Sequence, residues 1–357
     1  MKRPVSRSEE LLLIARLYYD DNLSKTAIAQ RVGLSVTHVA RLLEQCRSSG
    51  IVQIEYRGPR HESLARDLMR RFPCLREAIV VGTESDYVIQ TRTLAKAAAD
   101  YFDQHLATRR SIVKVGLSGG FTVFELVKAL PEQPRNITLY PTAILGRGEA
   151  IVQHVDPIAS LMTLWSKSGY REGGLHFVTV TPQEPQNGHL LTPVDVRAEL
   201  DRILQSKKIA RLYEAMSGLD IIFASVRQLG VPDKKIKKRM GAGPVDLLGE
   251  IGIHEQDLKG AVGDLNYCFI DQNGESRPEW RLFLSLQADQ LRQMARDPAK
   301  RVVVIAGQQK REILRAVLKG RLLNVLITDD MSAVSLLGEL PRGGAGEGST
   351  GSSSRAG

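Results

Sequence analysis

The spacing of apolar residues predicts three short helices in the first fifty positions. The first is predicted over 8–19 by apolar residues at helical spacing, namely Leu11, Leu12, Ala15, Tyr18 and Tyr19. Ser24 is placed to cap a second helix that ends before Gly33, because a serine hydroxyl can accept a backbone N–H of the first turn. Ser35 is placed in the same way to cap a third helix that extends to about residue 49.

The third predicted helix has one apolar and one polar face. Its apolar stripe consists of Val39, Leu42, Leu43 and Cys46. Its opposite face carries Thr37, His38, Arg41 and Gln45. Two short helices joined through Gly33, with the small Ala29 where they would cross, match the helix-turn-helix pattern. Alternation over 51–56 then predicts a wing strand.

The polar face offers side chains that suit DNA. Arg41 could pair with guanine and Gln45 with adenine, whereas His38 is either a base contact or an exposed neutral histidine. The predicted base-facing set is Ser35, Thr37, His38, Arg41 and Gln45, and the predicted phosphate contacts are Lys25, Arg31, Arg47, Arg57 and Arg60. A three-helix core without a role in DNA binding is the alternative, since serine-capped amphipathic helices are common.

A break at 58–60, Gly-Pro-Arg, separates this head from the rest of the chain. After it, a narrow apolar stripe predicts a linker helix within 58–76, formed by Leu64, Ala65, Leu68, Met69 and Phe72. The stripe could pair with a second subunit or pack on its own effector domain, and the sequence leaves both open. The predicted organisation is therefore a head over 1–57, a linker over 58–76 and an effector domain over 77–340.

From residue 77 onward, strands and helices alternate. Strands are predicted at 78–82, 112–117, 137–140, 175–180, 220–226, 266–271, 302–306 and 324–328, and helices at 87–106, 122–130, 157–168 and 194–216. Strands rich in Val and Ile are typical of a mostly parallel sheet that is covered by helices on both faces. Ligands of such sheets bind outside the carboxyl ends of the strands.

Four segments follow predicted strands or resemble loops at strand ends. Gly116 to Thr122 contains glycines that let the backbone approach an anion at a helix N-terminus, although a plain turn is the commoner reading of Gly-Gly. Lys310 lies in the first turn of a predicted helix, where a cation is unfavourable unless an anion is nearby. For Asp264 and Asp329, an Asx-turn or a helix cap is the favoured reading of each residue taken alone.

Charge and cysteine content narrow the class of protein. The chain has 357 residues and a net charge of +9, and residues 1–76 hold 14 basic against 8 acidic residues, or +6 of that total. This asymmetry favours a head that meets a polyanion. Three scattered cysteines predict no disulfide framework and no metal site. The absence of a signal-like or membrane-spanning stretch predicts a cytoplasmic protein, and the Gly/Ser-rich segment 341–357 predicts disorder.

Several of these motifs together resemble the SorC-type sugar-binding transcriptional regulators. The resemblance covers about residues 8–338 and rests on Ile28 to Ser35, on Arg71-Phe72-Pro73, and above all on Gly260-Ala261-Val262-Gly263-Asp264 and Leu323 to Asp329. It implies a winged helix-turn-helix head joined to an α/β domain shaped like glucosamine-phosphate deaminase and ribose-phosphate isomerase. It also implies a phosphorylated sugar or polyol as effector, and a tetrameric assembly.

Residue by residue, the resemblance implies an effector site with three parts. Ser118, Gly119, Gly120 and Thr122 would form the phosphate loop, Asp264 would accept sugar hydroxyls, and Lys310 would lie beside the phosphate. Two positions depart from the family pattern. Ala306-Gly307-Gln308 stands where the family usually has Ala-Gly-Gly, and Ser-Gly-Gly replaces its usual Gly-x-Gly.

The leading hypothesis is a regulator in which a sugar phosphate bound by the second domain changes the affinity of the head for a double-stranded DNA operator. The competing hypothesis is an isomerase-like or deaminase-like enzyme that uses a carboxylate such as Asp264 as base, with no cofactor in either case. A non-specific nucleic-acid protein is a third hypothesis, but only +3 of the charge falls beyond residue 76. A helix-turn-helix head also predicts at least a homodimer, because such heads commonly pair on two half-sites.

Overall fold

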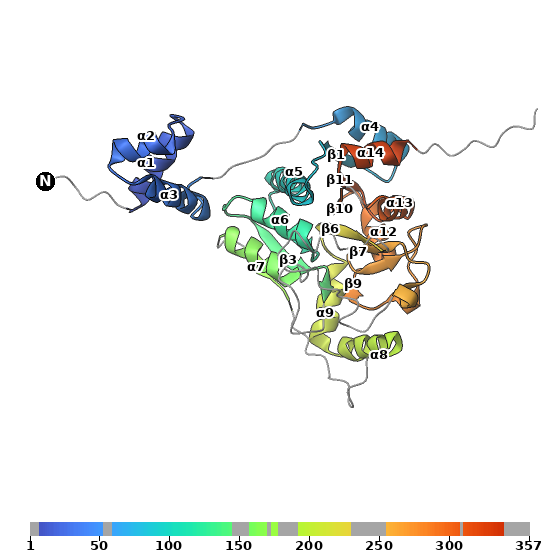
Figure 1. Cartoon of the computed structure of the whole chain (residues 1–357). Coiled ribbons are helices and arrows are strands. Elements are labelled where there is room, and N and C mark those ends of the chain that lie inside the picture. The colour runs from blue at the N-terminus through green and yellow to red at the C-terminus, as the bar shows by residue number, and fades with distance from the viewer. Residues whose placement is uncertain are drawn as a thin grey trace, which may run out of the picture. The chain divides into compact units, whose positions relative to one another are not determined.

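The computed structural model describes residues 7–52, 59–144, 157–169, 173–177, 192–229, 255–307 and 310–338. The chain divides into two compact units, Met1–Arg57 and Gly58–Gly357 (Figure 1). Among the described residues, no helix combines the length and apolar character that a membrane crossing requires.

The N-terminal unit contains the three predicted helices, α1 (Arg7–Tyr19), α2 (Lys25–Val32) and α3 (Val36–Ser48). Ser24 Oγ accepts the N–H of Ala27, and Ser35 Oγ accepts the N–H of His38, each at 3.1 Å, so both predicted serine caps are confirmed. Gly33 joins α2 to α3 in the left-handed conformation, with φ of 70°. The fully buried residues of the core come from all three helices, and include Ile14, Ile28, Val39, Leu42 and Cys46.

The predicted wing strand falls mostly outside the described residues. Ile51 and Val52 form bends, and 53–58 are not described, so the wing stays a prediction. The predicted phosphate contact Arg57 lies in the same undescribed segment.

The C-terminal unit is built on a parallel sheet whose strands follow the order β1-β11-β10-β6-β2-β3-β5. Their bounds are β1 (Glu77–Val81), β11 (Val325–Asp329), β10 (Arg301–Ile305), β6 (Ile221–Gln228), β2 (Val113–Leu117), β3 (Ile137–Pro141) and β5 (Gly174–Leu175). Two short antiparallel strands, β7 (Gly263–Leu265) and β8 (Cys268–Ile270), extend from the end of β6, and β4 (Ala143–Ile144) pairs with β9 (Leu284–Ser285). The expected mostly parallel sheet is therefore confirmed.

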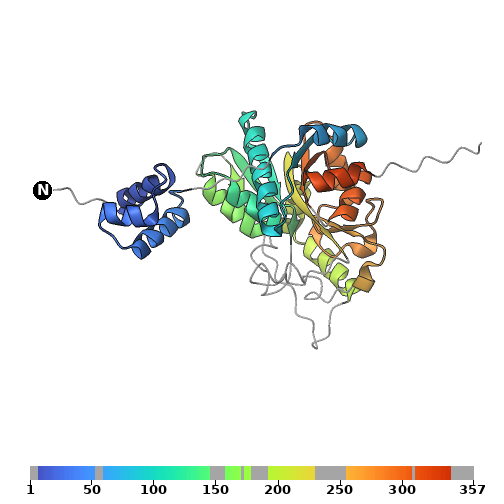
Figure 2. The ribbon, with the colours of Figure 1, turned by 45° about the horizontal axis from the view of Figure 1, so that its top comes forward.

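Helices cover both faces of this sheet (Figures 1 and 2). One face packs on α5 (Tyr87–Ala107), α6 (Phe121–Ala129) and α7 (Pro157–Lys167). The core on the other face includes α4 (Glu62–Arg71), α8 (Pro193–Leu204), α9 (Lys207–Met216), α12 (Ala288–Arg296), α13 (Arg311–Lys319) and α14 (Asp330–Leu337). Side chains of β10 alternate between the two cores, with Val303 in one and Val304 in the other, as the period of two in a strand requires.

The structure decides between the two readings of the linker helix. Helix α4 lies beside α14 (Figure 2), and its Leu68 is 0% exposed within the core of its own unit. The reading in which the stripe packs on its own effector domain is therefore the one observed. Leu68 has no surface left with which to contact a second subunit.

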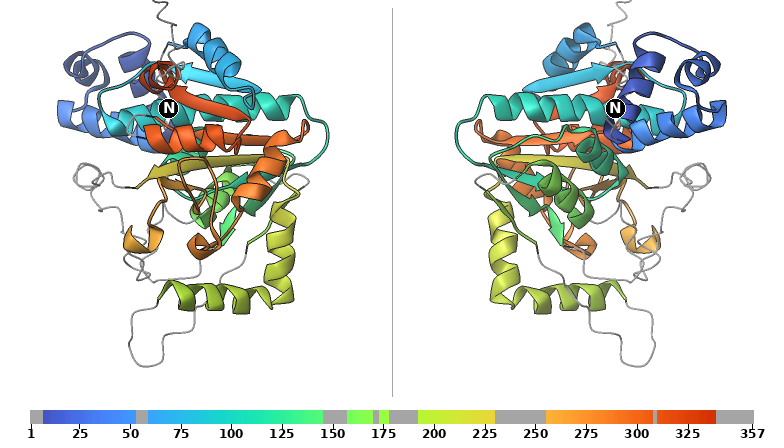
Figure 3. Two further views of the ribbon diagram at one scale, coloured as in Figure 1. Left: turned by 90° about the vertical axis from the view of Figure 1, so that its right-hand side faces the viewer. Right: turned by 90° about the vertical axis from the view of Figure 1, so that its left-hand side faces the viewer.

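Three predicted elements have different bounds from those expected. The single helix predicted over 194–216 is broken after α8, and the chain turns sharply there to begin α9 (Figure 3). Of the strand predicted over 266–271, only Cys268–Ile270 is observed, as β8, because Asn266 and Tyr267 take left-handed φ values of 56° and 61° and form the turn of the β7–β8 hairpin. Of the strand predicted over 175–180, β5 includes only Leu175, and 178–180 lie outside the described residues.

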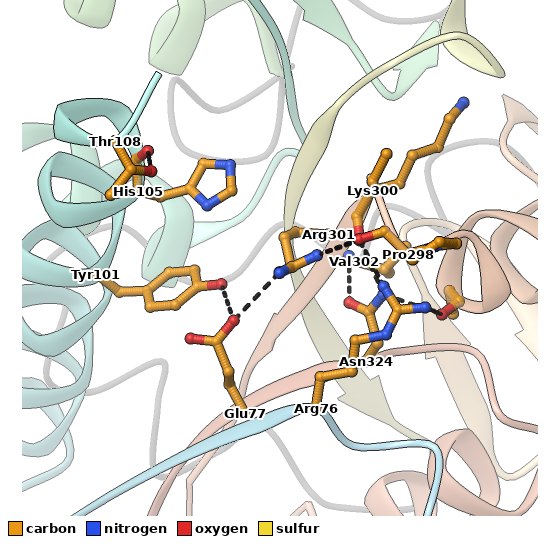
Figure 4. Close-up of polar contacts among 12 residues, drawn as sticks. Arg76, Glu77, Tyr101, His105, Thr108, Pro298, Lys300, Arg301, Val302 and Asn324 are labelled. Atoms are coloured by element: carbon orange, nitrogen blue, oxygen red, sulfur yellow. Dashed lines mark hydrogen bonds and ion pairs between the residues drawn. The ribbon is translucent and has the colours of Figure 1, made fainter.

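Polar contacts fasten the amino-terminal edge of the sheet (Figure 4). Glu77 Oε1 accepts hydrogen bonds from Tyr101 Oη and Arg301 Nε, each at 3.1 Å. The buried Asn324 accepts the N–H of Val302 at 2.8 Å. The opposite, carboxyl edge is where the predicted effector residues lie.

Candidate effector and DNA-binding sites

The strand order of the sheet reverses direction at the boundary between β2 and β6. From β2 the sheet grows through β3 to β5 on one side, and from β6 it grows through β10 to β11 on the other. In open α/β sheets, ligands bind at the carboxyl ends of the strands beside this point, because the loops diverge there and leave a crevice. The segments after β2, β6 and β10 are therefore the candidate effector site.

The segment after β2 leads directly into α6. Ser118 is 1% exposed, its N–H bonds the carbonyl of Phe223 on β6, and its hydroxyl donates to the carbonyl of Gly119 at 3.0 Å. Gly120 takes a φ of 108° immediately before α6, where it is the N-cap and no side chain caps the helix. A Cβ at Gly120 would lie 3.0 Å from Ser225 Oγ, so the turn after β2 packs closely against β6. Thr122, in the first turn of α6, is buried.

This geometry suits an anion only through the backbone. No described side chain caps α6 at Gly120, and helix N-termini of this kind bind anions through backbone N–H groups. The Ser118 hydroxyl, by contrast, already points at a main-chain carbonyl. The role expected of 118–122 as a phosphate loop therefore rests on main-chain donors, and it stays a prediction.

Arg227, at the end of β6, was not among the predicted site residues. Its Nε donates to Asp264 Oδ2 at 2.7 Å, and the two residues are direct partners in the β6–β7 ladder. The Arg227 side chain is 38% exposed, whereas that of Asp264 is 7% exposed. The pair thus combines a shielded carboxylate with an arginine that is accessible from outside. The only signal for it in the sequence is a charged residue at the end of an apolar strand, Ile-Ile-Phe-Ala-Ser-Val-Arg.

Asp264 also shapes the hairpin that follows it. Its Oδ1 accepts the N–H of Tyr267 at 3.0 Å, across the turn formed by Asn266 and Tyr267. Asp264 therefore bonds the backbone of its own turn, but three residues on rather than the two of the expected Asx-turn. A carboxylate has room for about four acceptor contacts, so this bond and the Arg227 bond leave capacity for a sugar hydroxyl. That second role stays a prediction.

Lys310 lies after β10, at the N-cap position of α13. The N–H of Glu312, in the first turn of that helix, is held by Gln228 Oε1 at 3.0 Å, which ties α13 to the end of β6. Gln308, one of the two departures from the family pattern, lies outside the described residues. Asp329, at the end of β11, caps α14 by accepting the N–H of Ser332 at 2.7 Å, so its helix-cap reading is confirmed.

The sheet brings these groups to three adjacent strands. Strand β6 pairs with β2 on one side and with β10 on the other. Neighbouring strands are about 4.8 Å apart, so the ends of β2 and β10 are separated by roughly 10 Å, a span that a six-carbon sugar phosphate can bridge. The Gly120 turn, the Arg227–Asp264 pair and Lys310 thus lie along one edge. Within the described residues, no group of three or more His, Cys, Asp or Glu side chains is arranged to bind a metal ion.

The polar face of α3 has the predicted composition. Thr37 and Arg41 are exposed, and the Arg41 guanidinium lies 3.4 Å from the ring Nε2 of His38. Gln45 is less available than expected, because its Oε1 accepts a 2.5 Å hydrogen bond from Arg7 of α1. The Ser35 hydroxyl serves as a helix cap, and Lys25 is exposed at the start of α2.

Comparison with known proteins gives similarity over both units. The chain is 26% identical over 334 residues to the deoxyribonucleoside regulator of Bacillus subtilis, which covers 91% of this chain and 96% of that protein. It is 25% identical over 348 residues to the sorbitol operon regulator of Klebsiella pneumoniae, with 92% and 97% covered. The crystal structure of full-length SorC from that organism matches the fold with a TM-score of 0.60 at 23% identity, covering 92% and 98%. Residues 188–338 match Sugar-bind, a sugar-binding domain family.

Proposed function

Because this chain is a SorC-type sugar-binding transcriptional regulator, we propose that a phosphorylated sugar or polyol binds at the carboxyl edge of its sheet and thereby changes the affinity of its N-terminal helices for operator DNA. The chain is a sugar-responsive regulator, and the phosphorylated state of the sugar and the residues that contact it are the proposed part. The similar proteins are named as regulators, which favours this class over an enzyme.

One observation carries the proposal for the effector. Two cationic side chains and a helix N-terminus lie on adjacent strands at the point where the strand order reverses: Arg227, Lys310 and the turn at Gly120. Phosphate is recognised by such a combination of arginine, lysine and backbone N–H groups. The carboxylate of Asp264, held by Arg227, supplies the acceptor that a sugar hydroxyl needs.

The proposal for DNA rests on α3. Arg41 is exposed, and its guanidinium can make the bidentate contact to guanine that is common in the major groove. We assign Thr37 and His38 to the same surface, and Lys25 to phosphate contacts. Gln45 contributes only where its bond to Arg7 opens, so it is the weakest member of the set.

We also propose that the protein acts as at least a homodimer, because one small head rarely buries enough DNA surface for specific binding. The contact must use a surface other than Leu68, which is buried in its own unit. Sedimentation velocity of the full chain checks this, since a monomer at micromolar concentration contradicts it.

A thermal-shift screen followed by calorimetry tests the effector proposal. A ligand that binds only the folded state raises its stability in proportion to the logarithm of ligand concentration over Kd. Sugar phosphates should raise the melting temperature, and calorimetry should give a Kd at least about tenfold lower for the phosphorylated member of a pair than for its dephosphorylated form. Equal affinity for both forms contradicts the phosphate assignment. No shift with any sugar phosphate or polyol phosphate contradicts the effector class.

A further inference from the structure

Residues 59–61, which follow the N-terminal unit, are hydrogen-bonded to the carboxyl end of β1. The proposed effector site lies at the same, carboxyl edge of the sheet. The N–H of His61 donates to the carbonyl of Val80 at 2.9 Å, and the N–H of Gly82 donates to the carbonyl of Pro59 at 3.0 Å. Residues 59–61 therefore lie along the open edge of β1, at its carboxyl end. Helix α4 begins directly after His61.

Strand β1 pairs with β11, whose last residue, Asp329, is followed directly by Asp330. Val81 is the register partner of Asp329, the last residue of β11. Asp330 is the first residue of α14. Strand β1, which residues 59–61 contact, is thus the direct neighbour of the strand that leads to these two carboxylates.

Asp329 packs against the segment that leads to Lys310. It is 0% exposed, and its Oδ2 lies only 2.6 Å from the position that a Cβ at Gly307 would occupy. Real Cβ atoms do not approach an oxygen so closely, so only glycine fits there while Asp329 stays in place. Gly307 and Asp329 are therefore in direct contact, and neither can shift toward the other.

Asp330 lies against the linker. Its Oδ2 is 3.5 Å from the ring Nε2 of His61, a buried nitrogen that makes no hydrogen bond within the described residues. Its Oδ1 accepts a 2.5 Å hydrogen bond from the Thr83 hydroxyl. Thr83 lies in the connection between β1 and α5. One carboxylate thus connects the linker, the end of β1 and the start of α14.

We propose that Asp329 and Asp330 form the route by which effector occupancy at Lys310 reaches the linker at His61. An anion bound by Lys310 displaces the backbone at Gly307, and Asp329 must follow because the packing leaves no space. Asp330, the next residue, then changes its contact with His61. The inference rests on the proposed function, since it assigns the regulation of the same site.

A double-mutant cycle on DNA binding tests this route without any effector. Gly307→Ala serves as the perturbation, because the added Cβ must displace Asp329. The probe is a duplex selected by the full chain from random-sequence DNA. Gly307→Ala should change its Kd by about 3- to 30-fold, the range that residues along a coupling route produce. In a His61→Gln background the same substitution should change Kd by less than about twofold.

Arg66→Gln provides the matched control. Arg66 lies on α4, which begins directly after His61, but its ion pair, at 3.8 Å, is with Glu62 of the same helix and does not involve β11 or α14. The effect of Gly307→Ala should persist in full in this background. An equal fold-change in the wild-type and His61→Gln backgrounds overturns the proposal, as does an unchanged Kd in Gly307→Ala alone.

If thermal melts show that Gly307→Ala folds poorly, the double-mutant cycle is repeated in a protein that also carries Leu94→Val. The new Cβ would also meet Leu94 Cδ1 at 2.8 Å, so Leu94→Val provides space on that side and leaves the conflict with Asp329. In the Leu94→Val protein, His61→Gln should again reduce the effect of Gly307→Ala on the DNA Kd to less than about twofold. An undiminished effect overturns the proposal. Because no sugar phosphate enters the cycle, its failure is distinguishable from failure of the effector screen.

Discussion

Arg227 and Asp264 are register partners across β6 and β7, and Arg227 Nε lies 2.7 Å from Asp264 Oδ2. The carboxylate is shielded and the arginine is partly exposed, so the arginine balances the aspartate and keeps part of its own surface accessible. Asp264 in addition fixes the Asn266–Tyr267 turn. A ligand that meets this pair finds a cation and an oriented acceptor side by side.

Arg227→Ala should therefore weaken both effector binding and the fold. Loss of a charge-assisted contact should cost about 1.5 to 3 kcal/mol of effector affinity, and the carboxylate of Asp264, left without its partner, should cost about 1 to 3 kcal/mol of unfolding free energy. Calorimetry and urea unfolding measure the two. Arg281→Ala is the matched control, because its 3.4 Å ion pair is with Asp201 of α8. Wild-type affinity in Arg227→Ala removes Arg227 from the site.

Lys310→Ala should reduce effector affinity by about 1.5 to 3 kcal/mol, because a lysine contact to phosphate is lost. DNA binding without effector should be unchanged. Lys319→Ala, at the opposite end of α13, removes an equal charge whose partner is Asn273 and should leave effector affinity intact. If both variants lose affinity equally, the effect is one of net charge and the assignment of Lys310 is wrong.

Arg41→Ala should weaken binding to the selected DNA site by about 1 to 3 kcal/mol and reduce discrimination against random DNA. Arg47→Ala removes another exposed arginine of α3, which lies 3.8 Å from Glu44. It should weaken selected and random DNA alike, as the loss of a phosphate contact does. Competition titrations at fixed salt measure both. Full discrimination in Arg41→Ala excludes Arg41 as a base contact.

His105 predicts a loss of stability in acid. Burial beside Tyr101 (Figure 4), and then the positive charges of Arg109 and Arg301, lower the pKa of His105. The neutral ring is thus favoured in the folded state. Its contribution is present above the unfolded pKa of about 6.5 and is lost as the pH falls below that value. Unfolding free energy should fall less steeply below pH 6.5 in His105→Gln than in wild type. Identical slopes in the two proteins contradict this.

The helices of the head and the strands of the sheet could be predicted from local sequence signals alone. Ser24, Gly33 and Ser35 predict the head because each cap or turn depends on its own residue type. Strands buried on both faces predict the sheet in the same way. The hairpin at Asn266 was missed because its left-handed turn depends on Asp264 and on a bond from Asn266 to the carbonyl of Thr142, more than 120 residues away.

The candidate site was predictable only in part. Lys310 and Gly120 follow strand ends, which a sequence reveals. Arg227 becomes notable only once β7 pairs with β6 and places Asp264 beside it, and that pairing joins segments 37 residues apart. Gln45 shows the opposite case, since a polar residue on the right face is held by Arg7 of a different helix. Tertiary contacts decide such positions.

The measurement that tests the account most directly is the affinity of the sugar phosphate with and without saturating operator DNA. Binding at two coupled sites is reciprocal, so an effector that changes DNA affinity by some factor must have its own affinity changed by DNA by the same factor, typically about 5- to 150-fold. We expect calorimetry on the full chain to give two different Kd values, with a ratio equal to the ratio of operator Kd values measured with and without the sugar phosphate. Identical effector affinities in the presence and absence of operator, for a sugar phosphate that does bind, contradict regulation by that ligand.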